Sequence, residues 1–369
     1  MNLDLTRFPE DPRDLLRAWD ASDDYLLAHL EEVGVSGEVV IVGDRWGALT
    51  TALAAHRPVQ ITDSFLTQEA TRANLKRNGV AEDAVRLLTT QDAPPSRIDV
   101  LLVRVPKNLG LLEDQLHRLA PAIHEGTLVV GTGMVTEIHT STLKLFEKII
   151  GPTKTSLAVR KARLIFATPD LSLPRVPSPW PLRYALEDGV GAVSGLTVTN
   201  HSGIFCADRL DMGTRFLLQN MPHSSGRERV ADLGCGNGVV GLAVALANPD
   251  AEVLFTDESY QAVASARETF HDNAGTAARF EIADGLSWVE PGSVDLVLNN
   301  PPFHTHKQTS DAVAWRMFTG SRTALRKGGE LWVIGNRHLG YHLKLRRLFG
   351  NCDVMTSDPK FVILRAVKR

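Results

Sequence analysis

The sequence predicts two α/β domains in tandem, each a doubly wound parallel sheet with helices on both faces. Its 369 residues exceed one ordinary compact core and suggest two domains of roughly 100 to 200 residues each. Continuous apolar runs of strand length alternate with helical runs, a pattern typical of parallel strands that are buried on both faces. The same order of signals occurs twice along the chain, which indicates an internal duplication.

Each half opens with a strand, a tight turn and a helix. In the second half, the apolar run 229–234 passes through glycines into the apolar helix 239–247. In the first half, the run 38–43 leads through residues 44–47 into a helical stretch at 48–55. The matching layout supports the duplication.

The later strands of the two halves also correspond. Runs 59–63 and 253–257 both end in an acid before an alanine-rich helical stretch. Runs 98–106 and 294–302 both finish in proline. In each half a helix, a glycine and one more strand follow. The order of elements is therefore the same in both halves.

The boundary between the copies is rich in proline. Prolines occur at positions 169, 174, 177, 179 and 181. Proline can continue neither a helix nor a central strand. We therefore expect a first domain over residues 1–168, a linker over 169–182 and a second domain over 183–369. The glycine-rich segment 184–205 is expected to add an antiparallel element before the second core.

The composition, 43% hydrophobic and 22% charged, is that of a soluble globular protein. The longest apolar run is about half the length that a membrane span needs, and the first 14 residues lack the apolar core of a signal peptide. We therefore expect a cytoplasmic protein with no membrane partner. Three scattered cysteines suggest neither a disulfide scaffold nor a zinc knuckle. His304 and His306 have no nearby cysteine or carboxylate to complete a metal site, so no metal is expected.

The charge balance does not by itself indicate a nucleic-acid partner. The net charge is −3, whereas nucleic-acid binders are usually basic. Basic residues do form local clusters that could bind phosphate, or that could simply be solvated helix faces. One such cluster near the end of the first domain comprises Lys154, Arg160, Lys161 and Arg163.

The strongest local signal is Asp232-Leu-Gly-Cys-Gly-Asn-Gly238, placed between a predicted strand and a predicted helix. Gly234, Gly236 and Gly238 let the backbone turn sharply and approach a ligand, and free N–H groups at the helix start favour an anion. Gly236 and Gly238, with Gly241, also satisfy the dinucleotide-binding fingerprint. An enzyme that uses a nicotinamide cofactor is therefore an alternative.

Asp232 favours S-adenosyl-L-methionine over a dinucleotide, whereas Asp257 would suit the ribose of either ligand. Asp232 precedes the first glycine by two residues and suits a ligand with an ammonium group, such as a methionine moiety. Asp257 ends the second strand and could accept from ribose hydroxyls, and Asp284 ends the third and could accept from the adenine amine. The structural alternatives are a turn acid for Asp284 and a helix cap before Ser259 for Asp257.

The run Asn299-Asn-Pro-Pro-Phe303 follows a predicted strand at the edge where open α/β sheets bind ligands. The exocyclic amine of a base is a poor nucleophile because its lone pair is delocalised into the ring. The side-chain oxygen of Asn300 and the carbonyl of Pro301 could accept its two N–H bonds and aim the lone pair at a methyl donor. Phe303 could stack on a base that is rotated out of its helix. The alternative is a proline turn that only closes the strand.

These residues resemble the class I methyltransferases, whose first motif reads like 232–238 and whose amine-methylating branch carries Asn-Pro-Pro followed by an aromatic residue. The whole chain resembles the ribosomal RNA guanine-N2 methyltransferases of bacterial ribosomal subunits. The segments that carry this likeness are 300–304 and 205–213, and, for the large-subunit branch, 16–27, 139–143 and 151–153.

The resemblance implies two Rossmann-like domains, of which the second is catalytic. It also implies S-adenosyl-L-methionine as cofactor, with Asn300 among the residues near it, and a guanine of 23S rRNA, guanine 1835, as target. Other enzymes with this motif methylate 16S rRNA guanine, adenine N6 in DNA or a protein glutamine, and a non-catalytic scaffold is a further alternative. The oligomeric state stays open.

The first half is expected to be a degenerate copy of the methyltransferase domain that binds RNA instead of cofactor. Alignment of the two strand-turn-helix units places Ile41 where Asp232 stands and Arg45 where Gly236 stands. Alignment of the later strands places Arg104 opposite Asn300 and Lys107 opposite Phe303. Such a cationic face suits phosphate. The alternative is a copy that is kept only for stability.

Overall fold

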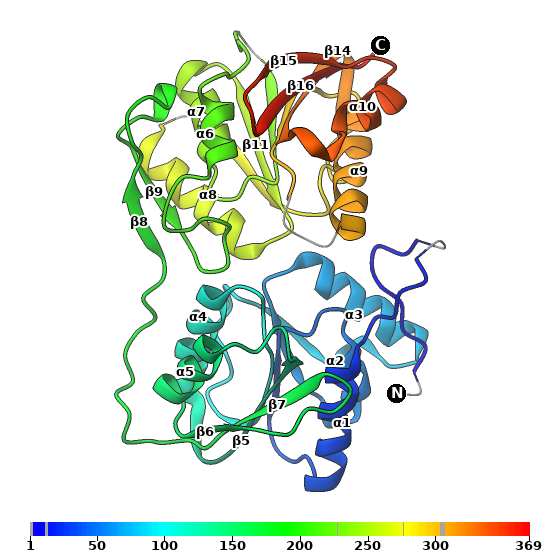
Figure 1. The fold of residues 1–369 in the computed structure, drawn as a ribbon, viewed down its shortest axis with the longest axis vertical. Helices are drawn as coiled ribbons and strands as arrows, with labels where there is room; N and C mark the ends of the chain where they lie inside the picture. The colour runs from blue at the N-terminus through cyan, green and yellow to red at the C-terminus, as the bar shows by residue number, and fades with distance from the viewer. Residues whose placement is uncertain (1–2, 12–13, 227, 276, 303–306) are drawn as a thin grey trace. The chain divides into compact units, whose positions relative to one another are not determined.

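The chain folds as two compact units, Met1–Trp180 and Pro181–Arg369 (Figure 1). The computed structural model describes residues 3–11, 14–226, 228–275, 277–302 and 307–369. In the described part of the chain, each unit is built on one seven-stranded sheet, and the second unit has a further two-stranded sheet. The predicted pair of α/β domains is confirmed.

The sheet of the first unit has the order β3-β2-β1-β4-β5-β7-β6. Its strands are β1 (Val39–Val42), β2 (Val59–Thr62), β3 (Arg86–Thr89), β4 (Ile98–Arg104), β5 (Ile123–Met134), β6 (Thr153–Thr155) and β7 (Ala162–Ala167). Its helices are α1 (Ala21–Val33), α2 (Ala48–Ala52), α3 (Phe65–Arg77), α4 (Leu109–Leu119) and α5 (Thr140–Ile149). Strand β7 is antiparallel to both of its neighbours, and the pairs among β1 to β5 are parallel.

The second unit repeats this plan with the order β12-β11-β10-β13-β14-β16-β15, in which β16 is the reversed strand. Its strands are β10 (Arg229–Leu233), β11 (Glu252–Asp257), β12 (Ala278–Ile282), β13 (Val294–Asn299), β14 (Leu325–Asn336), β15 (Asp353–Ser357) and β16 (Phe361–Val367). Its helices are α6 (Met212–Leu218), α7 (Val239–Ala247), α8 (Tyr260–Asn273), α9 (Lys307–Ala324) and α10 (Tyr341–Phe349). The identical strand order supports the duplication that the sequence predicts.

Successive residues of the second sheet face two different helix layers, as the alternation of side chains along a strand requires. Val230 and Val253 pack in a core with residues of α7 and α8. Their neighbours Ala231 and Leu254 pack in a second core with residues of α9 and α10. This burial on both faces explains why the strands read as continuous apolar runs.

The proline-rich segment packs against the first unit. The Ser178 hydroxyl donates to the Asp114 carboxylate of α4 at 2.6 Å, and the Trp180 indole N–H donates to Glu113 at 3.3 Å. The Arg175 guanidinium donates to the carbonyl of Ile149 at 3.0 Å. The boundary between the two compact units therefore falls between residues 180 and 181 of the chain. The expected antiparallel element follows as a hairpin of β8 (Leu182–Ala185) and β9 (Thr197–Asn200).

Candidate active site

The candidate residues of the second unit follow four strands that are neighbours in the sheet. Asp284 follows β12, Asp257 ends β11, the glycine loop 234–238 follows β10, and Asn300 follows β13. These strands are parallel, so their carboxyl ends lie at one edge. The chain order reverses between β10 and β13, which is the switch point where open α/β sheets bind ligands.

The glycine loop has the backbone that its sequence predicts. Gly234, Gly236 and Gly238 have φ angles of 72°, 54° and 77°, a left-handed region that favours glycine. A Cβ atom on Gly236 would meet nothing within 4 Å, so this glycine leaves its surroundings open. A Cβ on Gly241 would lie 2.3 Å from the Phe255 ring, so Gly241 is required for the close packing of α7 on β11.

Asp232 is buried at the end of β10, with 4% of its surface exposed. Its Oδ2 accepts a hydrogen bond from the backbone N–H of Gly241 at 2.8 Å, in the first turn of α7. Burial raises the pKa of Asp232 to about 7, and the Gly241 hydrogen bond opposes that shift. A cationic ligand group beside Asp232 would restore its ionised form.

Asp257 joins the glycine loop to the next helix. Its Oδ2 accepts from the Gly236 N–H at 3.1 Å, and its Oδ1 accepts from the Ser259 N–H at 3.1 Å. The cap of α8 is Ser259, whose hydroxyl accepts from the N–H of Ala262. Asp257 is therefore not the cap itself. Burial raises its pKa. The backbone N–H groups of Ser259, Gly236 and Glu258 oppose that shift.

Asp284 lies one strand further along the same edge. Its Oδ1 is 3.5 Å from the guanidinium of Arg316 on α9, and both side chains are about one-third exposed. The adjacent Gly285 has φ of 58°, and its carbonyl accepts from the Thr256 hydroxyl at 2.9 Å. This hydrogen bond holds the loop after β12 against β11, and it keeps Asp284 at the carboxyl edge of the sheet.

The two asparagines at the end of β13 have different surroundings. Asn299 is buried, and its Nδ2 donates to the carbonyl of Leu233 on β10 at 2.8 Å, which ties the two strands together at the switch point. Asn300 donates through Nδ2 to the Thr214 hydroxyl at 2.9 Å and to Asp211 Oδ2 at 3.5 Å. Its Oδ1 is buried and accepts no hydrogen bond within the described residues.

The rest of the motif is described in part. Pro301 is buried, whereas Pro302 is exposed. The predicted stacking residue Phe303 and the pair His304 and His306 lie outside the described residues. Asp211 and Thr214, which hold the Asn300 amide, are not among the site residues that the sequence predicts. The run Asp211-Met-Gly-Thr214 has the pattern of a helix start, and that was the available signal.

The corresponding edge of the first unit is filled by its own side chains. The guanidinium of Arg104 is 2.6 Å from Asp20, 2.9 Å from Glu137 and 3.4 Å from Asp23. Arg45 also pairs with Glu137. The Arg104 side chain is only 1% exposed. The expectation that Arg104 presents a cation to phosphate is therefore wrong, because three carboxylates neutralise it inside the fold.

The glycine loop of the first unit also differs from that of the second unit, because one of its own side chains caps the helix that follows. Gly43 and Gly47 keep the left-handed angles of Gly234 and Gly238. Between them, the Asp44 carboxylate accepts from the N–H groups of Ala48 and Thr50 at the start of α2. The helix N–H groups that could have met a ligand anion are therefore occupied by the protein's own carboxylate.

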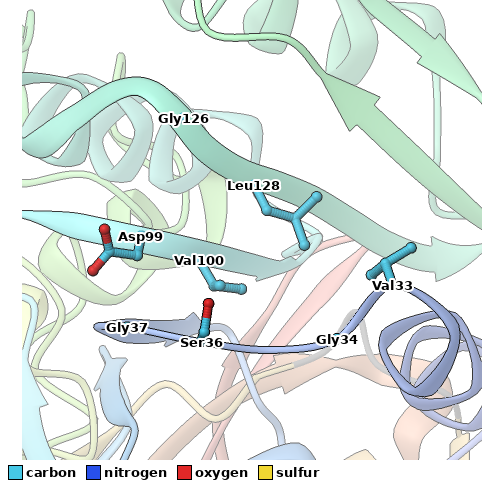
Figure 2. A pocket seen from close by; sticks show the side chains of 8 residues that line it. All are labelled: Val33, Gly34, Ser36, Gly37, Asp99, Val100, Gly126 and Leu128. Atoms are coloured by element: carbon cyan, nitrogen blue, oxygen red, sulfur yellow. The ribbon is translucent and has the colours of Figure 1, made fainter.

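A hollow of about 440 Å³ lies elsewhere in the first unit (Figure 2). It is lined by Val33, Gly34, Ser36, Gly37, Asp99, Val100, Gly126 and Leu128. Apart from Gly126 and Leu128 of β5, these residues lie at or before the starts of β1 and β4, at the amino edge of the first sheet. The Asp99 carboxylate already accepts from the Glu38 N–H at 2.8 Å and contacts His124 at 3.0 Å. This hollow lies away from the carboxyl ends of the parallel strands, which are where the candidate site of the second unit is formed.

Two other kinds of feature are absent from the described residues. No group of three or more histidine, cysteine or acidic side chains there could hold a metal ion. No described helix is both long enough and apolar enough to cross a membrane.

The two units match two family models in turn. Residues 1–171 match the model described as RLMG N-terminal domain, and residues 195–365 match the model described as Methyltransferase small domain. Among solved structures, a T. thermophilus 16S rRNA N2 G1207 methyltransferase in complex with AdoMet and guanosine aligns with a TM-score of 0.78 at 20% identity. The alignment covers 100% of this chain and 95% of that one, so the two-unit fold is shared.

Curated relatives match over nearly the whole chain. A Streptomyces avermitilis protein named ribosomal RNA large subunit methyltransferase G is 73% identical over 367 residues, which cover 99% of this chain and 97% of the relative. A Stutzerimonas stutzeri protein of the same name is 48% identical over 373 residues, which cover 100% of this chain and 97% of the relative. The chain belongs to the ribosomal RNA large subunit methyltransferase G family.

Proposed function

We propose that the second unit transfers a methyl group from S-adenosyl-L-methionine to the exocyclic N2 of a guanine in 23S rRNA. One observation carries the proposal. Asn300 Oδ1 is a buried acceptor without a donor in the described residues, at the switch point and beside the glycine loop. A buried acceptor left without a donor costs about 1–3 kcal/mol, and the N–H of a target amine would remove that cost.

The residues at the edge fit S-adenosyl-L-methionine. The open space at Gly236 admits a ligand next to the loop backbone. Asp232 would pair with the ammonium group, Asp257 would accept from the ribose hydroxyls and Asp284 from the adenine amine. When it is bound, the sulfonium supplies an electrophilic methyl group. The loop of Gly234 and Gly238 would hold the methionine part near the start of α7.

The reaction needs alignment more than acid or base catalysis. Asn300 Oδ1 and the Pro301 carbonyl would accept the two N–H bonds of the amine and direct its lone pair away from the ring. Positive charge that develops on nitrogen is stabilised by the same two acceptors. The methylated ammonium is strongly acidic and loses its proton without a dedicated base. Holding two reactants in line can contribute roughly 7 to 11 kcal/mol.

The family and the strand order favour this reading over a dehydrogenase. The dinucleotide-binding sheet is parallel, with the order 3-2-1-4-5-6. Here a reversed strand, β16, is inserted between β14 and β15. The names of the relatives support ribosomal RNA of the large subunit as substrate. That substrate supports a cytoplasmic location.

The test of substrate and base is mass spectrometry of nucleosides. Purified protein is incubated with deproteinised 23S RNA and labelled S-adenosyl-L-methionine, and 16S RNA, DNA and a glutamine-containing release factor serve as comparison substrates. We expect N2-methylguanine in 23S RNA, at guanine 1835 if the family likeness extends to the nucleotide. N6-methyladenine or methylated glutamine as the product would overturn the proposal.

The Asn300→Ala variant tests the catalytic assignment. Removal of one charge-stabilising group costs about 10²- to 10³-fold in rate in comparable sites. We expect the methylation rate to fall by at least about 10²-fold, with cofactor affinity within about twofold of wild type, because Asn300 acts on the target amine. Single-turnover methylation and calorimetry measure the two quantities. A near-normal rate would refute the role of Asn300.

We also propose that the first unit binds RNA and no cofactor. Arg160 and Lys161 are exposed in the connection from β6 to β7, and Lys107 is exposed after β4. The N–H of Val135, directly after β5, donates to the Lys161 carbonyl at 2.7 Å, so this connection lies at the carboxyl edge. The sequence assigns these three cations to phosphate together with Arg104, and they have no carboxylate partner in the described residues, whereas Arg104 is neutralised.

A further inference from the structure

We infer that Asp211 and Thr214 are positioning residues that set which end of the Asn300 amide faces the target amine. The inference rests on the proposed function, since it assigns Asn300 Oδ1 as the acceptor. It concerns a different question, namely what prevents the amide from presenting its NH₂ group instead. Both residues belong to the start of α6, in a segment remote in sequence from the Asn-Pro-Pro motif.

The hydrogen bonds between these three residues run in one direction. Asp211 Oδ2 accepts from the Thr214 backbone N–H at 2.9 Å and from the Thr214 hydroxyl at 3.2 Å. Because the hydroxyl has a single hydrogen and gives it to Asp211, its lone pairs face Asn300. The Asn300 Nδ2 donates to that hydroxyl oxygen at 2.9 Å.

The opposite orientation of the amide is disfavoured by the nearby carboxylate. If the amide were rotated by 180°, Asn300 Oδ1 would face Thr214 Oγ1 and lie near the Asp211 carboxylate. To pair that oxygen, the hydroxyl would have to turn its single hydrogen away from Asp211, and the Asp211 carboxylate, which only accepts, would still lie near Asn300 Oδ1 with no donor between them. The rotated amide would also present N–H groups to a target amine that itself donates. Asp211 and Thr214 therefore select the reactive orientation.

Helix α6 provides a firm base for this contact. Leu217 and Leu218 are buried in the core shared with α7 and β10. Phe216 stacks on Phe361 of β16 with ring centroids 6.3 Å apart. A Cβ on Gly213 would lie 3.0 Å from Asp211 Oδ2 and 3.4 Å from the Phe361 ring, so glycine allows the close approach. A helix start fixed in this way can hold the amide without a mobile loop.

The test compares Thr214→Val with Thr214→Ser. Valine keeps the shape of threonine and removes the hydroxyl, whereas serine keeps the hydroxyl. We expect Thr214→Val to lower the single-turnover methylation rate about tenfold, the size of one missing hydrogen bond. Thr214→Ser should stay within about threefold of wild type. Thr323→Val, which removes an exposed hydroxyl bonded within α9, serves as the matched control and should not change the rate.

Two further measurements distinguish a positioning role from a purely structural one. Cofactor affinity and the thermal midpoint of Thr214→Val should match those of the control. In the Asn300→Ala background, Thr214→Val should cause no further decrease of the residual rate, because its effect passes through Asn300.

The outcomes separate the two proposals. A near-normal rate in Asn300→Ala would refute the proposed function itself. An inactive Asn300→Ala together with a normal Thr214→Val would overturn only the positioning role. Equal decreases in the valine and serine variants, or a tenfold decrease that persists without Asn300, would also overturn it.

Discussion

Asp232 illustrates how one buried carboxylate can link cofactor binding to pH. Burial raises its pKa to about 7 in the protein without ligand, so the carboxyl becomes protonated as the pH falls below that value. A ligand ammonium pairs only with the ionised form. Ligand affinity should therefore be highest above pH 7 and should weaken by up to about tenfold per pH unit below it.

Calorimetry with S-adenosylhomocysteine, which carries the same ammonium, measures this dependence between about pH 5.5 and 7.5. The Asp232→Asn variant, which cannot ionise, should bind more weakly, by about tenfold or more at pH 7.5, and with little pH dependence. A wild-type dissociation constant that does not vary over this range would contradict the assignment of Asp232 to the ammonium group.

Arg104 shows at the same scale why some site properties could not be read from the sequence. Its alignment opposite Asn300 is consistent with the strand registers, in which Val42 pairs with Val103 as Leu233 pairs with Asn299. Its surroundings come from Asp20, which is 84 residues away, and Glu137, which is 33 away. A pattern within one segment indicates a position in the sheet, and tertiary contacts decide whether a charge is free or neutralised.

At the scale of elements, the sequence predicts a helix or strand correctly where residues within that one segment determine its structure. Helix α7 spans Val239–Ala247, the predicted range, because it follows a glycine turn and Asn248 caps its carboxyl end. The helix predicted over 48–55 is shorter, since α2 ends at Ala52 and a 3₁₀ turn over Ala54–His56 follows. The contact of Asp211 with Asn300 joins segments 89 residues apart, and no single-segment pattern reveals it.

The connection between β6 and β7 is the element on which RNA binding by the first unit can be tested. Replacing both Arg160 and Lys161 by Glu should weaken binding of 23S RNA, because fewer phosphates are neutralised. The slope of log affinity against log salt concentration should become shallower by roughly 0.7 to 0.9 for each phosphate that is no longer neutralised. Cofactor affinity should not change. Filter binding at several salt concentrations measures the effect.

The matched control reverses two exposed cations elsewhere in the same unit. Lys76 lies in the last turn of α3 and Lys148 in the last turn of α5, both at the amino edge of the sheet. Replacing these two by Glu changes the net charge equally. If both double variants weaken RNA binding to the same extent, the effect is one of overall charge, and the carboxyl edge has no special role.

At the scale of the whole molecule, the duplication raises the question of how many cofactors one chain binds. Both units keep the seven-stranded order and the left-handed glycines that flank the loop. In the first unit, Arg45 stands where Gly236 stands in the second, and it pairs with Glu137 in the Arg104 cluster. The carboxylate of Asp44 covers the start of α2. We therefore expect one bound cofactor per chain.

The Gly236→Arg variant copies this feature of the first unit into the second. Gly236 has φ of 54°, and its surroundings are open, so an arginine there would be strained and would extend its side chain into the space that the ligand needs. Calorimetric titration should give one site in the wild type and none in Gly236→Arg, with the variant still folded by circular dichroism. Two sites in the wild type, with one left in the variant, would show that the first unit also binds cofactor. The duplication would then have preserved two working sites instead of converting one to an ion-pair cluster.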